Sequence, residues 1–375
     1  MRRSLSAVLA GLGVLAAGVG LAGAPTVSPP TRPGEAVAAG VLALPAAPAL
    51  NTVRFGRVEY VDAADFGARF GLKFAWLEDD KRFQLKGTAT KWEIRVDSRE
   101  SIIDGQRVFL GDPVRLSKGR PYFSRIDVER LLTPIVQPGW GVTRVPALRT
   151  IVIDPGHGGK DTGKVNERLK VQEKDLALDT ALRLKQRLEQ DGYHVALTRD
   201  DDRAVELIER TTIARQEQAD LFLSIHYNSV ENDVERVSGV EVYTMTPQHQ
   251  LSADQKPDDQ VDVYNDGNRY DHWNAVLGDL MHRQLLRELK VSDRGFKRGR
   301  LAVLRLAPCP AVLIESGYLS QDAEARKIVT PVYRQKIAEA IADGVRAYAG
   351  ILDGLRKKPT ADLPRESRVG KLFSP

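Results

Sequence analysis

Two histidines and one glutamate lie at or near the ends of predicted strands, where we expect them to be close together. His157 follows the β-branched run 151–153 and lies in a glycine-rich stretch, and His226 follows the apolar run 221–225. Glu173 lies just before a helix that we expect to begin near Asp175. In an α/β sheet, sites are built at the carboxyl ends of the strands. Two imidazoles and one carboxylate are the ligand set of an open catalytic zinc site, so the pattern predicts that His157, Glu173 and His226 bind Zn²⁺.

A second carboxylate offers proton transfer. Glu315 ends the aliphatic run 311–314, where burial raises the pKa of a carboxyl group unless a cation offsets it. A raised pKa suits proton exchange near neutral pH, so we predict that Glu315 is the catalytic acid–base group. The alternative is a strand-end carboxylate held in a salt bridge.

The remaining candidate ligands are predicted to be structural. His194 lies at a strand start, His249 in a polar loop, and His272 and His282 on helix surfaces. The only cysteine is Cys309, which excludes an intrachain disulfide and any cysteine-based zinc site. A proline stands on each side of it, and we expect it to be a small core residue.

The glycines after the first strand do not form a phosphate cradle. Gly163-Lys164 is followed by Val165, so the GxxxxGK[ST] pattern fails. The 55 Lys and Arg residues exceed the 50 Asp and Glu residues only slightly, and they are spread along the chain. Without clustered basic and aromatic residues, nucleic acid is not an expected partner.

Length and composition predict two domains behind an export segment. The chain has 375 residues, more than one ordinary core needs. Residues 1–24 begin with Arg2-Arg3, continue as an uncharged apolar run and end in small residues, which is the layout of a secretory signal. We assign 1–38 to the signal and the Pro- and Ala-rich residues 39–50 to a linker, and we expect the protein in the periplasm or cell envelope. A twin-arginine signal and an uncleaved anchor, the one expected membrane contact, stay open.

Residues 51–140 are predicted to form a small α+β module. Short strand-like runs alternate with one helix around 61–70, and the sequence IDGQ at 103–106 predicts a hairpin turn. Gly71-Leu72, Trp76, 102–105, Pro113 and 122–132 together resemble the copper amine oxidase N-terminal-like domain of exported wall proteins. No histidine precedes His157, so no copper site is expected. We expect a wall-associated module or a spacer.

From residue 147 to 352 strands alternate with helices, which predicts a helix-flanked, mostly parallel or mixed sheet of the α/β class. Strands are expected at 151–153, 194–199, 219–229, 239–245, 301–306 and 311–316. Helices are expected from about 175 to 191, at 204–218 and 273–289, and from Thr330-Pro331 onward. Residues 353–375 are expected to form a polar tail.

The motifs of this part resemble, in order, those of the zinc-dependent N-acetylmuramoyl-L-alanine amidases of the amidase-3 family. They are IDPGHGGKDTG, TRDDD with LIERTTIAR, ADLFLSIHYNS, DRGFKRGRLAVLR and PAVLIESGYLS. The resemblance covers residues 148–350. It implies a phosphorylase/hydrolase-like fold, zinc on His157, Glu173 and His226, and Glu315 as the catalytic carboxylate. It further implies cleavage of the amide between N-acetylmuramic acid and L-alanine in peptidoglycan, and an activator protein is a conceivable second partner.

Substrate contacts are predicted at Asn228, Arg294 and Lys297, with Arg298 as a further candidate for the carboxylates of the stem peptide. Tyr227, Arg215 and Tyr318 depart from the family pattern and could reshape the substrate groove.

The polar segment 246–272 is the largest irregularity. Some family members carry an inhibitory helix here that plugs the zinc with a glutamate, but this segment has no glutamate. We expect a flexible loop at the rim of the groove.

Two other functions share part of this evidence. A non-enzymatic wall-binding protein would not need the complete ligand set and Glu315. A zinc peptidase or deacetylase would share the chemistry, but the HExxH motif is absent.

Overall fold

The computed structural model describes residues 50–253 and 261–357. The predicted signal segment, nearly all of the predicted linker, and the chain beyond residue 357 lie outside these ranges, so the predictions made for them stay predictions. Within the two described ranges, no helix is both long and apolar enough to cross a membrane.

Residues 52–136 are mostly strands. The strands are β1 (Thr52–Phe55), β2 (Val58–Asp62), β3 (Lys73–Glu78), β4 (Arg82–Lys86), β5 (Lys91–Arg95), β6 (Glu100–Ile103), β7 (Gln106–Phe109), β8 (Arg115–Ser117) and β9 (Arg120–Ser124). The helical segments are α1 (Ala63–Arg69), α2 (Arg125–Asp127), η1 (Val128–Leu132) and α3 (Thr133–Val136). The predicted hairpin turn is confirmed: Asp104 and Gly105 both have positive φ, as a tight turn between β6 and β7 requires.

Strands and helices alternate from residue 150 onward. The strands are β10 (Thr150–Pro155), β11 (Val165–Asn166), β12 (Val171–Gln172), β13 (His194–Leu197), β14 (Leu221–Asn228), β15 (Val240–Met245), β16 (Asp293–Gly299) and β17 (Ala311–Tyr318). The helices are α4 (Glu173–Gln190), α5 (Leu207–Gln216), η2 (Asp266–Tyr270), α6 (Asp271–Leu289), α7 (Ala302–Arg305), α8 (Asp322–Ile328) and α9 (Pro331–Arg356). Thr330 caps α9 by accepting a hydrogen bond from the Tyr333 amide, as the Thr-Pro signal predicted.

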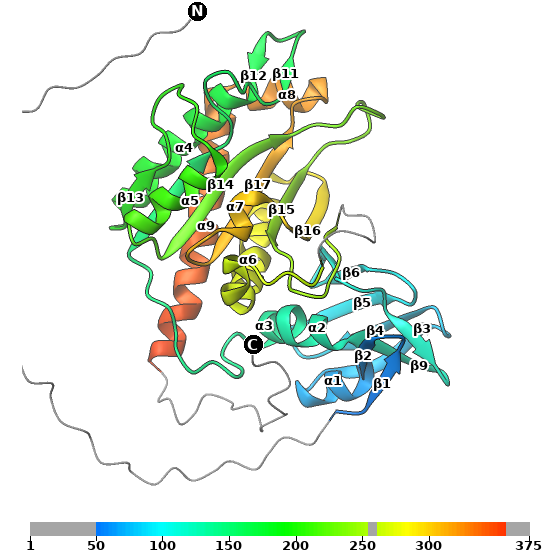
Figure 1. Cartoon of the computed structure of the whole chain (residues 1–375). Helices are drawn as coiled ribbons and strands as arrows, with labels where there is room; N and C mark the ends of the chain where they lie inside the picture. The colour runs from blue at the N-terminus through cyan, green and yellow to red at the C-terminus, as the bar shows by residue number, and fades with distance from the viewer. Residues whose placement is uncertain (1–49, 254–260, 358–375) are drawn as a thin grey trace, which may run out of the picture. The chain divides into compact units, whose positions relative to one another are not determined.

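A mixed sheet with helices on its two faces is the centre of the fold, which confirms the predicted class (Figure 1). Strands β13, β10, β14 and β17 run parallel, β15 runs antiparallel to β17, and β16 runs parallel to β15. Ile151 and Ile153 belong to the core on the side of α4, α6 and α9, whereas Val152 packs into a second core that includes Ala214 and Leu304. Because β10 is buried on both faces, its apolar run does not alternate with polar residues.

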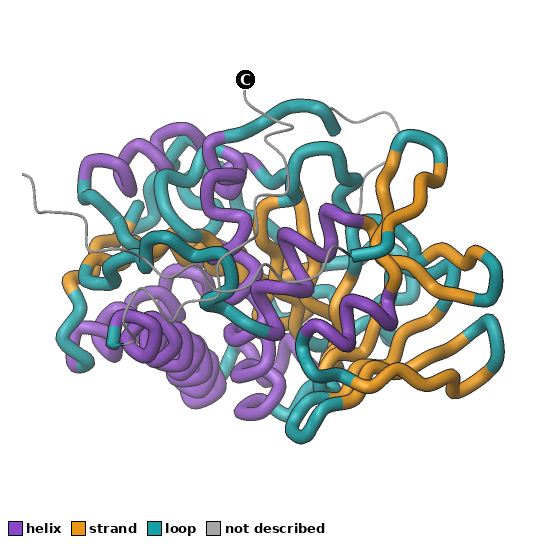
Figure 2. The backbone as a smooth tube through the Cα atoms, turned by 90° about the horizontal axis from the view of Figure 1, so that it is seen from below, coloured by secondary structure: helices purple, strands orange, loops and turns teal. Residues whose placement is uncertain are grey.

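The sheet continues into the N-terminal residues. Its strand order is β13-β10-β14-β17-β15-β16-β7-β6-β5-β4-β3, and the junction is the pairing of Phe296 in β16 with Val108 in β7. A buried ion pair spans the same boundary: Arg298 donates to Asp127 at 2.5 Å. The tube view shows most helices toward the left and many of the strands toward the right (Figure 2). The boundaries 51–140 and 147–352 remain predictions, but the two stretches share one sheet.

One predicted strand is wrong. Residues 301–306 do not form a strand, because Ala302–Arg305 is helix α7, with Val303 and Leu304 buried. The strand lies before it, at Asp293–Gly299. A short apolar run fits a buried helix turn as well as a strand.

Candidate metal centre and active site

His157 stands at the end of β10 in a strained backbone conformation. Its φ is 61°, in the left-handed region that residues other than glycine rarely adopt. The Nδ1 atom of its ring lies 2.9 Å from the carboxylate of Asp161, and its Nε2 atom lies 3.0 Å from Glu173. A hydrogen bond from Nδ1–H to Asp161 leaves Nε2 as the nitrogen free to bind a metal.

Glu173 is the first residue of α4 and directly follows the short hairpin β11–β12. Its Oε2 accepts a hydrogen bond from the Lys164 amide at 2.9 Å, and its Oε1 accepts one from the Tyr227 amide at 3.1 Å. A carboxylate is also stabilised by the amide groups at a helix N-terminus. Glu173 is therefore fixed in position and held as an anion.

His226 lies inside β14, beside the end of β10. Its Nδ1 atom lies 2.9 Å from Glu173 Oε1. Its ring lies over Gly156, where a Cβ would be only 2.3 Å from the imidazole. Gly156 therefore makes room for the imidazole.

His157, Glu173 and His226 are brought together as the sequence predicted. One ligand atom from each lies within 4.8 Å of the others, and this is the group that could hold a metal ion among the described residues. Burial alone would raise the pKa of Glu173, but the hydrogen bonds from His157 and His226 hold it well below its usual range. Burial opposes protonation of His157, yet its contacts with Glu173 and Asp161 raise its pKa above the usual value.

These residues fit a divalent cation. Two imidazole nitrogens meet at one carboxylate oxygen, and His₂Glu is a known donor set for catalytic Zn²⁺. At Gly163 a Cβ would be 2.6 Å from both Glu173 and His157, so the loop leaves this space to the donor groups.

Two buried arginines hold the loop that carries His157. Arg210 donates to Asp154 at 2.8 Å and to the backbone oxygens of Pro155 and His157, both at 2.8 Å. Arg199 donates to the backbone oxygen of Gly156 at 2.7 Å and to that of Pro155 at 3.1 Å. The motifs TRDDD and LIERTTIAR were recognised in the sequence, but these roles were not predicted. The available signal was one arginine inside each motif, Arg199 in TRDDD and Arg210 in LIERTTIAR.

Glu315 lies directly beside His226. The two residues are paired in the register of β17 and β14, and Glu241 of β15 is paired with Glu315 on the other side. Glu315 is half-buried as a residue, but its Oε2 is shielded from solvent and has no hydrogen-bond partner in the described part of the chain. Burial raises the pKa of Glu315 well above its usual value, and the charges of Glu173 and Glu241 raise it further against a smaller effect of Lys297. The predicted environment of this carboxylate is confirmed.

Glu241 is a buried carboxylate that the sequence did not reveal. It accepts hydrogen bonds from the hydroxyl groups of Tyr318 and Tyr243. Lys297 lies 3.0 Å from it, and Arg294 lies 4.0 Å away. Two of the predicted substrate contacts are therefore already next to a protein carboxylate.

The other predicted contacts differ in their placement. Asn228 stays at the site, because it ends β14 and donates to the Tyr318 hydroxyl at 3.3 Å. Arg298 is 5% exposed and its guanidinium is paired with Asp127, so the suggestion that it meets the substrate is wrong. Of the departures from the family pattern, Tyr318 faces the site, whereas Tyr227 turns to Thr180 and Arg215 pairs with Asp266 on the surface.

The four histidines predicted not to bind metal lie outside the cluster. His194 and His249 are exposed, and the ring of His272 lies 2.7 Å from the Pro138 backbone oxygen. The expectation that His282 lies on a helix surface is wrong, because it is fully buried and its ring lies 2.7 Å from Asp293. Cys309 is buried, as predicted.

The segment 246–272 does not begin at the rim of the site. Because β15 runs antiparallel to β17, Glu241 lies next to Glu315 and Met245 lies at the opposite end of the sheet. The segment continues from there, and Gln250 is buried against Asp112 and Ser124. For the described flanks of this segment, the predicted position at the groove is therefore wrong. Residues 254–260 lie outside the described ranges.

Two open pockets, with volumes of about 380 and 690 Å³, are lined mostly by N-terminal residues. Arg82 and Arg95 line the first, and Tyr60 and Leu251 are among the residues that line the second.

The fold and these side chains define an α/β domain with a candidate divalent-metal centre and an adjacent buried carboxylate. The chain belongs to the amidase-3 family, whose model, described as N-acetylmuramoyl-L-alanine amidase, matches residues 151–347.

Relatives with names agree with this assignment. The chain is 32% identical over 256 residues to N-acetylmuramoyl-L-alanine amidase AmiC of Escherichia coli O6:H1, which covers 60% of this chain and 59% of AmiC. It is 34% identical over 199 residues to N-acetylmuramoyl-L-alanine amidase LytC of Bacillus subtilis, covering 53% of this chain and 35% of LytC. Among solved structures, N-acetylmuramoyl-L-alanine amidase AmiC2 of Nostoc punctiforme is 33% identical, with a TM-score of 0.45. The match covers 55% of this chain and 99% of AmiC2. The matched region thus spans well under two thirds of AmiC and of LytC.

Proposed function

We propose that this protein is a zinc-dependent peptidoglycan hydrolase that cleaves the amide between N-acetylmuramic acid and the L-alanine of the stem peptide. The observation that carries the proposal is the placement of Glu315 beside the cluster of His157, Glu173 and His226 in a member of the amidase-3 family. Wall amidases act outside the cytoplasm, which agrees with the secretory signal predicted for residues 1–38.

Each side chain has a distinct role in the proposal. His157, Glu173 and His226 hold Zn²⁺, which when bound acidifies a water molecule and polarises an amide carbonyl. Glu315 accepts a proton from the attacking water and donates it to the departing alanine nitrogen. Burial raises its pKa, which favours the step in which it donates the proton. Asn228 and Arg294 contact the substrate, and Lys297 holds Glu241 beside Glu315.

The test is digestion of purified peptidoglycan by the full chain, with and without a chelator, followed by mass spectrometry. We expect stem peptides that begin with L-alanine and uncut glycan strands, and we expect the chelator to stop their release. In Glu315→Gln we expect turnover to fall by about two to four orders of magnitude. The protein should keep its bound metal, measured by atomic absorption, because Glu315 is not a ligand.

Glu339→Gln is the matched control, since Glu339 is exposed on α9. Loss of metal from Glu315→Gln would show that a ligand has been taken for the base. Wall binding by the full chain without any release would contradict the proposed function and favour a non-enzymatic wall-binding protein.

A further inference from the structure

One row of residues crosses the sheet away from the metal centre. His226 is paired with Glu315, Glu315 with Glu241, and Glu241 with Gly295. Side chains directly opposite each other on neighbouring strands share a face of the sheet. The face that carries Glu315 therefore extends over β15 to β16.

Phe109 carries this face across the boundary between β16 and β7. Gly295 has no side chain, and a Cβ there would be 2.5 Å from the Phe109 ring. The ring centroid lies 5.5 Å from Lys297 Nζ, which itself lies 3.0 Å from Glu241. Phe109 is thus two contacts away from the carboxylate next to Glu315, although it belongs to the N-terminal residues.

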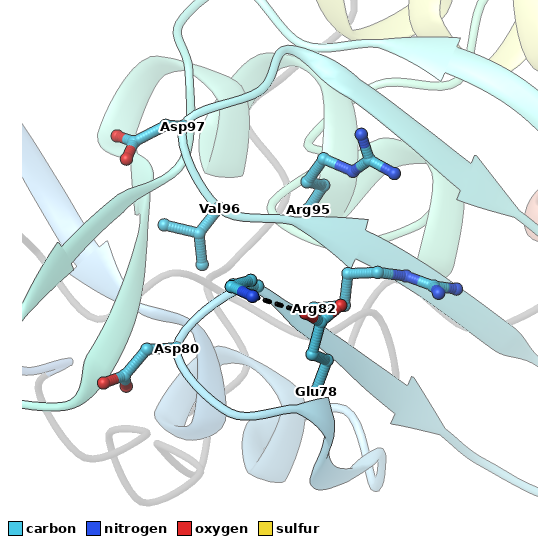
Figure 3. Close-up of a pocket in the computed structure, with 7 residues that line it drawn as sticks. Glu78, Asp80, Arg82, Arg95, Val96 and Asp97 are labelled. Atoms are coloured by element: carbon cyan, nitrogen blue, oxygen red, sulfur yellow. Dashed lines mark hydrogen bonds and ion pairs between the residues drawn. The ribbon is translucent and has the colours of Figure 1, made fainter.

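The same face continues outward over β6, β5 and β4. Phe109 is paired with Glu100, and Arg95 is paired with Arg82. Figure 3 shows Arg82 and Arg95 extending toward the same side, whereas Asp80 and Asp97 point the other way. From β17 to β4 there are six strand spacings, or about 29 Å at about 4.8 Å each.

Cations outnumber carboxylates on this surface, which we name the outer face of β4–β7. Its outward charged residues are Arg82, Lys86, Lys91, Arg95 and Arg107 against Glu93 and Glu100. Glu93 pairs with Lys91 at 2.6 Å and with Arg82 at 3.5 Å, and Glu100 pairs with Arg107 at 3.0 Å. Within the described ranges, no carboxylate lies at ion-pair distance from Lys86 or Arg95. The outer face therefore has positive charge to offer an anionic ligand.

We propose that the outer face of β4–β7 binds the carboxylates of stem peptides that neighbour the one being cut at Glu315. This inference rests on the proposed function, because it takes peptidoglycan as the substrate. A wall polymer presents the same carboxylates repeatedly, so a second attachment about 29 Å from Glu315 raises the effective concentration of the polymer at the site. A short soluble muropeptide does not reach both Glu315 and the outer face, so the outer face does not raise its affinity.

The test compares two double variants that lose the same charge. Arg82→Gln/Arg95→Gln alters the outer face, and Arg287→Gln/Lys336→Gln alters exposed residues of α6 and α9. Each pair is placed in the full-length Glu315→Gln chain, and binding to sacculi stripped of attached polymers is measured by co-sedimentation. We expect the first pair to weaken binding about tenfold and the second less than about twofold. We also expect the chain with an unaltered outer face to bind weakly to sacculi whose carboxylates have been amidated with carbodiimide. This binding should be as weak as that of the Arg82→Gln/Arg95→Gln variant to untreated sacculi.

Turnover separates this proposal from the proposed function. With Glu315 intact, the outer-face variant should cleave a short muropeptide at the normal rate and show a raised KM for sacculi only. Equal binding by both double variants, or full binding to amidated sacculi, would overturn the inference. Binding that disappears once the attached polymers are stripped also overturns it. If no chain cleaves either substrate but the outer-face variant still binds less, the proposed function fails and the binding surface stands.

Discussion

His157 is held in a backbone conformation that costs free energy. A non-glycine residue in the left-handed region costs of order 1–3 kcal/mol and persists only where its surroundings fix it. Here the fixing groups are Arg199 and Arg210, whose guanidinium groups bind the backbone oxygens on and before His157. This conformation places Nε2 3.0 Å from Glu173, within the candidate metal centre.

Arg210→Lys is expected to weaken metal binding by about 10- to 100-fold, which is typical when a group supporting the ligands is removed. Lysine keeps the charge beside Asp154, but a single ammonium group does not reproduce the separate bonds to Pro155 and His157. The affinity is measured by competition with a chromophoric chelator.

Arg187→Lys is the control, because Arg187 pairs with Asp191 on the surface of α4. Equal metal affinity in both variants would remove the proposed role of Arg210. A loss of affinity in both would point to a general effect of replacing arginine.

At the level of elements, helix α6 begins with a buried acid. Burial raises the pKa of Asp271 to about 7, and the hydrogen bond from Asn268 and the charges of nearby arginines do not offset it. An unfolded aspartate has a pKa of about 3.9, so the folded state binds the proton more tightly. The stability contributed by this group is therefore present at low pH and is lost as the pH rises from about 4 to about 7.

Asp271→Asn should remove that loss. At pH 8 we expect the free energy of unfolding of the variant to exceed that of the wild type by a few kcal/mol at most, since one pKa unit corresponds to about 1.4 kcal/mol. Near pH 4 we expect the two free energies to differ little. Urea unfolding of both proteins at the two pH values measures the difference. The same difference at both pH values would show that folding does not raise the pKa of Asp271.

Strands that are apolar along their whole length were predictable, and strands held by their neighbours were not. The runs before His157, His226 and Glu315 are buried strands, and with the family motifs they located the candidate site. β16 contains two glycines and four charged residues, so nothing in its own sequence favours a strand. It is a strand because β15 pairs on one side and β7 on the other. The burial of His282 and the pairing of Arg298 also depend on these distant neighbours.

At the level of the whole molecule, the N-terminal residues and the amidase-3 residues should unfold together. Asp127 is fully buried and also accepts hydrogen bonds from the amides of Gly111 and Asp112 and from Ser124, besides pairing with Arg298. Removing one partner of a buried ion pair costs about 3–5 kcal/mol.

We therefore expect one cooperative thermal transition for the full chain, and a shift of that whole transition to lower temperature in Asp127→Ala. Differential scanning calorimetry makes the measurement. Asp353→Ala is the control, because Asp353 pairs with Arg356 on the surface, where such pairs contribute about 0–1 kcal/mol. Two separate transitions, of which Asp127→Ala moves only one, would show that the two parts unfold independently.

The pairing of β7 with β16 also decides the order in which this chain can mature. Val108 and Phe296 lie far apart in sequence, and contacts of such long range make folding slow. Until β16 is made and delivered, β7 offers an open edge of unpaired backbone groups to any neighbouring chain. The nascent protein is thus most prone to aggregate in the interval before β16 has been synthesised and has paired with β7.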